Sequence, residues 1–212
     1  MPALLRQRAV VNAAVAGLLA SIVVWLGPPG ADLAAHVFQR NLFLTHGFAL
    51  WTNYWYAGRY SFVGYSLLYY PLAAVLGIKL LAVLSVAAAS GAFTLVAERA
   101  FGTTASLASR FFAVAAAASA LSAAFPYALG LALALFALLA VERRQRALFA
   151  VFVALTLAAS PLAFLLLSVI LAGVGVSRSR REITQPAIVI AVIGAIGLLL
   201  LRLFPNGGSF PF

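Results

Sequence analysis

The sequence contains no cysteine and few charged residues. Without cysteine among its 212 residues, the chain cannot form a disulfide, a thiolate metal site or a cysteine nucleophile. Only 8% of the residues are charged, whereas a soluble domain has about a quarter. Hydrophobic residues make up 65% of the chain and the mean hydropathy is +1.10. A chain this short has no core that can bury so much apolar surface, so a soluble globular protein is excluded.

Acidic residues are the rarest charged group. Four Asp and Glu stand against fourteen Lys and Arg, which gives a formal net charge of +10. In a soluble protein this excess would suggest nucleic acid, but here the bases cluster between apolar runs. Bases in such places are typical of topology signals and of contacts with anionic lipid headgroups. The composition therefore predicts a membrane protein and disfavours nucleic-acid binding.

Long apolar runs predict an all-α, polytopic transmembrane helix bundle of about seven spans. The spans are Ala9–Gly27, Leu80–Ala97, Leu107–Ala124, Tyr127–Val141, Ala147–Ala159, Pro161–Val176 and Ala187–Leu203. Residues 1–212 are expected to form a single membrane domain, with a large first extracytoplasmic loop over 28–78 and the remaining spans within 79–203. Because proline disfavours helix continuation, we expect a short helical hairpin over 147–176 with Ser160-Pro161 at its outer tip.

The distribution of bases predicts the orientation of the chain. With the N-terminus in the cytoplasm, ten bases lie inside and four outside, as the positive-inside rule requires. The inside bases are Arg6, Arg8, Arg99, Arg110, Arg143, Arg144, Arg146, Arg178, Arg180 and Arg181, and the outside bases are Arg40, Arg59, Lys79 and Arg202. The use of arginine over lysine and the many alanines fit a high-GC bacterial genome. The expected location is therefore the bacterial cytoplasmic membrane.

The outside loop begins with a pattern that predicts an amphipathic helix from Asp32 to His46. At about 100° per residue, the polar side chains share an arc of roughly 120°, and apolar side chains occupy the remainder. The polar arc contains Asp32, His36, Gln39, Arg40 and His46, interrupted by Phe43. Such a helix can lie at the membrane surface with its apolar side down.

The acidic and histidine side chains of this helix allow two interpretations. Asp32 is either a residue that stabilises the first helical turn or a general base at the membrane boundary. His36, one turn further on, either solvates the helix or supports that base. His46 reads as a basic residue complementing the helix C-terminus. Ten residues of helix hold the two imidazoles roughly 15 Å apart, too far for one zinc ion.

Aromatic residues crowd the second half of the loop. Tryptophan and tyrosine favour headgroup depth, so an interfacial belt explains part of the pattern. The alternative is a ligand-binding wall, in which Asn53, Trp55 and Tyr56 contact a carbohydrate and Arg59 holds a lipid phosphate. Arg40 on the preceding helix is a further candidate for substrate binding.

Taken in order, these motifs resemble the N-terminal half of GT-C superfamily polytopic membrane glycosyltransferases. The resemblance lies within residues 31–82, and it is carried by Ala31-Asp32-Leu33-Ala34-Ala35-His36, Asn53-Tyr54-Trp55-Tyr56-Ala57-Gly58, Tyr69-Tyr70-Pro71 and Ile78-Lys79-Leu80-Leu81. It implies transfer of a sugar from a polyprenyl-phosphate donor to an acceptor on the extracytoplasmic face. By motif position, Asp32 would be the catalytic acid of the first loop, with His36 in support.

The chain departs from that family pattern in two ways. Many members carry two adjacent acids where this chain has Ala31-Asp32. One carboxylate and one histidine supply few ligands for a divalent cation, so a metal site is doubtful. No metal ligands are therefore assigned. Family members also continue with further helices, whereas residues 204–212 read as the start of another outside segment. The chain is expected to be the N-terminal module of a longer protein, or to have a partner protein that supplies the missing helices.

Two other function classes stay open at this point. The first is a non-catalytic integral membrane subunit that binds a polyprenyl lipid or a partner enzyme. The second is a transporter, which is less favoured because no Asp, Glu or His lies inside a predicted span.

Overall fold

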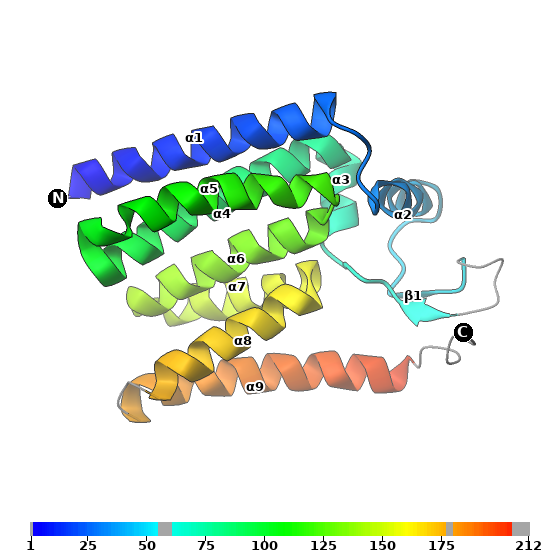
Figure 1. The fold of residues 1–212 in the computed structure, drawn as a ribbon. Helices are drawn as coiled ribbons and strands as arrows, with labels where there is room; N and C mark the ends of the chain where they lie inside the picture. Colours follow the sequence, from blue (N-terminus) through cyan, green and yellow to red (C-terminus); the bar gives the residue numbers. More distant parts are fainter. Residues whose placement is uncertain (1, 55–60, 177–179, 205–212) are drawn as a thin grey trace.

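The computed structural model describes residues 2–54, 61–176 and 180–204, and nearly all of them are helical (Figure 1). The long helices are α1 (Pro2–Leu26), α4 (Ile78–Phe101), α5 (Ser106–Ala118), α6 (Phe125–Glu142), α7 (Arg146–Ala159), α8 (Pro161–Val176) and α9 (Arg180–Leu203). The loop after α1 contains α2 (Leu33–His46), β1 (Trp51–Thr52), β2 (Phe62–Val63) and α3 (Tyr69–Leu76). Two 3₁₀ turns, η2 (Gly102–Ala105) and η3 (Ser119–Leu121), flank α5.

Four helical stretches within the described residues are long and apolar enough to cross a membrane. They are Ala3–Leu26, Ile78–Leu121, Phe125–Glu142 and Ile183–Leu203, and two shorter apolar helices cover Arg146–Ala159 and Pro161–Gly175. The all-helical membrane bundle predicted from the sequence is therefore confirmed at this level. The stretch 78–121 is not one straight helix, because the chain reverses at Gly102, whose φ of 68° favours glycine. After this turn α5 runs back beside α4 (Figure 1).

The α1–α4 pair is the most extensive helix contact in the bundle. Small residues allow the two backbones to approach, since a Cβ added at Gly91 would lie 3.3 Å from that of Ala13. In lipid, close packing of small residues and polar contacts drive helix association. Three polar contacts join the helices: the Arg8–Glu98 ion pair at 3.0 Å, the Asn12 Nδ2–Thr94 Oγ1 hydrogen bond at 3.0 Å, and the Ser90 hydroxyl donating to the Asn12 carbonyl at 3.1 Å.

The helix break predicted at Ser160-Pro161 is present between α7 and α8. The buried Ser160 has an extended backbone, and its Oγ accepts a hydrogen bond from the Ala163 N–H at 3.3 Å. Pro161 then begins α8, at the position where its missing N–H costs nothing. A Cβ at Gly130 of α6 would lie 2.8 Å from the Ser160 and Ala163 side chains, so a larger residue would separate α6 from this turn.

The elements outside the bundle gather at one of its ends. Figure 1 shows α2 almost end-on, across the direction of α1 and α9, beside the end of α1. The short antiparallel strands β1 and β2 pair Trp51 with Val63 and follow α2. Arginine-bearing helix ends lie at the other end, where α1 starts and α6 passes into α7 (Figure 1). The chain therefore separates a polar, aromatic end from an arginine-rich one.

Candidate functional site

The candidate site lies on the loop 28–78, which backbone contacts fix to the end of the bundle. Gly30 packs against the turn between α5 and α6, because a Cβ there would lie 2.6 Å from the Ala123 nitrogen. The next contact is an Asp32 N–H bond to the Ser122 carbonyl at 3.2 Å. Further along, the Leu67 and Leu68 N–H groups donate to the Ala158 carbonyl at 2.8 and 3.0 Å. The loop is thus held at both of its sides by helix ends.

His36 is the buried centre of this end of the molecule. Its Nε2 lies 2.8 Å from the Ala123 carbonyl oxygen and its Nδ1 lies 3.2 Å from the Tyr70 hydroxyl. Because a carbonyl oxygen only accepts, Nε2 carries the hydrogen and Nδ1 accepts from Tyr70. The rings of Tyr69 and Phe125 complete the enclosure, with centroids 5.9 and 5.6 Å from the imidazole. Both nitrogens of His36 are therefore already occupied.

Burial sets the protonation of this cluster. It lowers the pKa of His36, an effect that the hydrogen bond to Ala123 and the charge of Asp32 oppose. It also raises the pKa of Tyr70 and of Tyr69, so both phenols stay protonated. A neutral imidazole and a neutral phenol match the donor and acceptor roles that the geometry requires.

The orientation of α2 differs from that expected of an amphipathic surface helix, whose polar arc would face water. His36 is buried, and Gln39 and Arg40 are half-buried, while Val37 and Leu44 are 42% and 54% exposed. Phe43, which interrupts the polar arc, packs against the apolar cluster that contains Tyr69 and Tyr70. The middle of the arc, from His36 to Arg40, faces the bundle because that end of the bundle offers carbonyl and phenol partners. A hydrophobicity pattern contains no information about such partners.

Asp32 is separate from this buried cluster. The residue occupies the position before α2, is exposed, and makes no side-chain hydrogen bond that caps the helix. Its charge acts on His36, and its backbone carbonyl accepts from the His36 N–H at 3.1 Å. The structure therefore places the predicted pair next to each other, with the carboxylate at the surface and the imidazole inside.

Arg40 joins α2 to α3. Its Nε donates to the Ala73 carbonyl at 2.8 Å, and the side chain is half-buried. The planar guanidinium has further donors on its two terminal nitrogens. Arg40 thus has an evident structural contact, and it keeps donors that can meet an anion.

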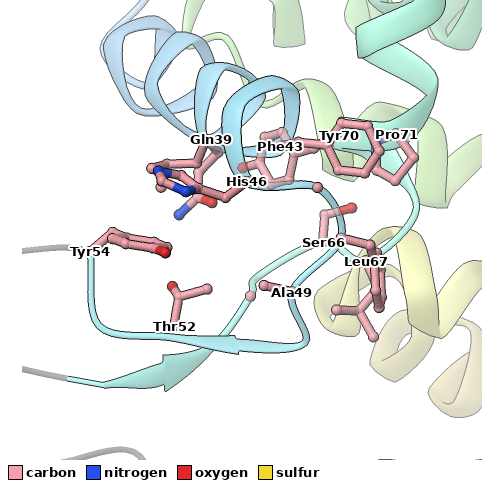
Figure 2. A pocket seen from close by; sticks show the side chains of 14 residues that line it. Gln39, Phe43, His46, Ala49, Thr52, Tyr54, Ser66, Leu67, Tyr70 and Pro71 are labelled. Carbon is pink, nitrogen blue, oxygen red and sulfur yellow. The ribbon is translucent and has the colours of Figure 1, made fainter.

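A small open pocket lies between α2, the β1–β2 hairpin and α3 (Figure 2). Polar side chains of Gln39, His46, Thr52, Tyr54, Ser66 and Tyr70 line it, together with apolar residues that include Phe43, Leu67 and Pro71. Its space for water is about 40 Å³, whereas one water needs about 10–15 Å³. In this conformation the pocket admits a few waters and not a sugar ring.

His46 and Tyr54 form one wall of that pocket. Their rings stack (Figure 2), and the centroids lie 4.7 Å apart with an interplanar angle of 17°. Both side chains are exposed. This contact joins the end of α2 to the chain after β1.

The remaining predicted binding residues are only partly visible. Asn53 is exposed and does not line the pocket. Trp55, Tyr56 and Arg59 lie outside the described residues. Among the residues that are described, no group of three His, Asp or Glu side chains lies close enough to hold a metal ion.

Tyr70 is a site residue that the sequence analysis named only within a resemblance motif, without a role in the site. Its hydroxyl bonds to His36 and its side chain lines the pocket, so it connects the buried cluster with the open one. A buried tyrosine usually finds a hydrogen-bond partner. The doublet Tyr69-Tyr70 before Pro71 could therefore have indicated a hydrogen-bonded site residue. The interpretation of the loop aromatics as an interfacial belt explained the same residues.

Comparison with protein-family models, with curated proteins and with solved structures finds no match to this chain.

Proposed function

We propose that this chain is a GT-C-like membrane glycosyltransferase, or its N-terminal module. It transfers a sugar from a polyprenyl-phosphate donor to an acceptor at the membrane surface that carries α2. The observation that carries the proposal is the Asp32 carboxylate, which is exposed at the start of α2 and caps no helix. It is the one acid between residues 1 and 97. Its position agrees with the catalytic acid that the family resemblance implies.

The proposed topology has seven crossings, with the N-terminus in the cytoplasm and α2 outside. Two features support it: the alternating direction of the long helices in Figure 1, and the gathering of arginines at the end away from α2. The positive-inside rule assigns that arginine-rich end to the cytoplasm. A bacterial cytoplasmic membrane is the proposed location.

In the proposed reaction, Asp32 acts as general base. The carboxylate takes the proton from an acceptor hydroxyl as its oxygen bonds to the anomeric carbon, and the bond from that carbon to the donor phosphate breaks. The polyprenyl phosphate leaves with the bonding electron pair. Arg59 and Arg40 are the proposed partners of the phosphate, and Asn53, Trp55 and Tyr56 the proposed sugar contacts. His36 keeps α2, and so Asp32, in position.

The test is sugar transfer in membranes that contain the chain and polyprenyl-phosphate sugars. Asp32→Asn keeps the size of the side chain and removes its basicity, so transfer is expected to fall by about 10²–10⁴-fold, the usual contribution of a general base. Asn41→Ala is the matched control, because Asn41 is also exposed on α2. Expression and membrane insertion should be equal in all three proteins. Equal transfer by Asp32→Asn would remove Asp32 from the mechanism.

A non-catalytic, lipid-binding subunit is the second candidate. The small pocket and the fully engaged His36 favour it, since neither offers a ready catalytic centre. The two candidates differ in one measurement. If the chain binds polyprenyl phosphate, but neither the wild type nor Asp32→Asn makes product, and a larger transferase copurifies with the chain, the subunit role is favoured.

A further inference from the structure

A second hollow lies inside the bundle, away from the loop. It lies between α4, α5 and α6, and its lining includes Val86, Ala89, Phe112, Ala115, Ser119 and Tyr127. The space within it is about 170 Å³. Both α5 and α6 pack on α4, which forms the floor of a groove between them. We refer to this hollow as the α5–α6 groove.

The α5–α6 groove is continuous with the lipid-facing surface. Ala115, which lines it, is exposed, and the apolar side chains of Leu107, Phe111 and Val114 on the same helix are 76%, 73% and 55% exposed. These helices belong to stretches apolar enough to cross a membrane. In a bilayer the groove is therefore a recess in the lipid-facing surface. A hydrocarbon chain that fills this recess makes van der Waals contacts with its lining that an empty recess would lack.

One polar group marks the end of the groove. Tyr127 is in the first turn of α6, is half-buried, and its hydroxyl has no hydrogen-bond partner within the part of the chain that the structure describes. Ser119 lines the same end, and its hydroxyl already donates to the Ala116 carbonyl at 2.6 Å. The donor available at this end is thus the Tyr127 hydroxyl, which interacts electrostatically with Tyr65 and lies at the headgroup depth that tyrosine favours.

We propose that the α5–α6 groove binds one acyl chain of a bilayer phospholipid, whose ester carbonyl accepts a hydrogen bond from Tyr127. The size fits a chain segment, since an apolar cavity of about 150 Å³ already holds benzene. This volume is too small for a second helix, which is about 10 Å in diameter. Ester carbonyls lie where hydrocarbon meets headgroups, which is the depth of the first turn of a span. This site does not depend on the proposed transferase activity.

Photolabelling of the whole chain in vesicles tests the site. The vesicles consist of dioleoylphosphatidylcholine with a small fraction of phosphatidylcholine that carries a diazirine in one acyl chain. After illumination, mass spectrometry maps the adducts. We expect adducts to concentrate on groove residues such as Phe112 and Ala115, above their level on other lipid-facing helix surfaces.

Three variants separate the groove from ordinary lipid contact. Ala115→Phe fills the groove and is expected to lower its labelling severalfold, whereas Ala118→Phe on the same helix, exposed but outside the groove lining, leaves it unchanged. Tyr127→Phe is expected to lower labelling about threefold, the factor for an average polar contact of about 0.6 kcal/mol within membranes. Labelling spread evenly over the helices and insensitive to Ala115→Phe would overturn the proposal. Displacement of the probe by trace polyprenyl phosphate would also overturn it, because the occupant would then be a different lipid.

Discussion

His36 and His46 stand on the same helix, yet they have opposite environments. His36 is 6% exposed and both of its nitrogens are hydrogen-bonded, whereas His46 lies at the surface against Tyr54. Protonating His36 would give Nδ1 a hydrogen and remove the acceptor that Tyr70 uses. The docking of α2 against the bundle should therefore respond to pH through His36.

Acidification is predicted to loosen α2. Because burial lowers the pKa of folded His36 below its ordinary value of 6.5, the unfolded form binds more protons in the window just below that value. The stabilisation is then complete above about pH 6.5 and is lost as the pH falls below that value. The equilibrium constant for loosening α2 rises by up to about tenfold per pH unit in this range. The measurement is amide hydrogen exchange in α2 between neutral and mildly acidic pH, corrected for the intrinsic exchange rate.

Two glutamine variants identify the responsible group. His36→Gln can still donate to Ala123 and accept from Tyr70 but does not titrate, so α2 protection should become independent of pH. His46→Gln should leave the dependence as in the wild type. A dependence that survives in His36→Gln would contradict the assignment to His36, and Tyr69 and Tyr70 would not explain it, because burial raises the pKa of both phenols.

At the scale of elements, the existence of the helices was predictable and the orientation of α2 was not. Apolar runs located the membrane helices, and the proline at residue 161 located the break after α7. The inward face of α2 depends on the Ala123 carbonyl, which a turn with a positive φ of 61° directs at His36. A periodicity argument treats His36 as polar and thus solvent-facing, because its partner lies 87 residues further along the chain.

Helix packing should be more sensitive to size than to polarity. Gly91→Leu places a side chain against Ala13 and the Ala9 carbonyl, so it is expected to destabilise the α1–α4 pair by about 2–3 kcal/mol. Asn12→Ala removes the hydrogen bond to Thr94 and should cost about 0.6 kcal/mol, the average for such contacts in membranes. Unfolding of the purified protein in mixed detergent micelles measures both values.

Val11→Ala is the control for this pair, since Val11 is 52% exposed on α1 and should change stability by less than about 0.5 kcal/mol. The packing account fails if Gly91→Leu is no more harmful than Asn12→Ala.

At the scale of the whole molecule, the central claim is that the two ends of the helix bundle have different roles. The end with α2 holds Asp32, His36 and the polar pocket, and the opposite end holds the Arg8–Glu98 pair and the α6–α7 turn. The proposed transfer from a lipid-linked donor requires that the α2 end be extracytoplasmic. Composition predicted the membrane helices between these two ends, whereas the pocket depends on contacts between α2, β1 and α3 that no local pattern encodes.

The most direct test uses the absence of cysteine, which lets a single introduced cysteine report one position. Asn41→Cys on α2, Thr104→Cys between α4 and α5, and Gln145→Cys between α6 and α7 are all at exposed residues. In right-side-out membrane vesicles, a membrane-impermeant maleimide should label Asn41→Cys at once and the other two only after permeabilisation. A Thr104→Cys that stays unreactive throughout would contradict the seven-crossing topology, and an Asn41→Cys that needs permeabilisation would place Asp32 on the wrong side of the membrane.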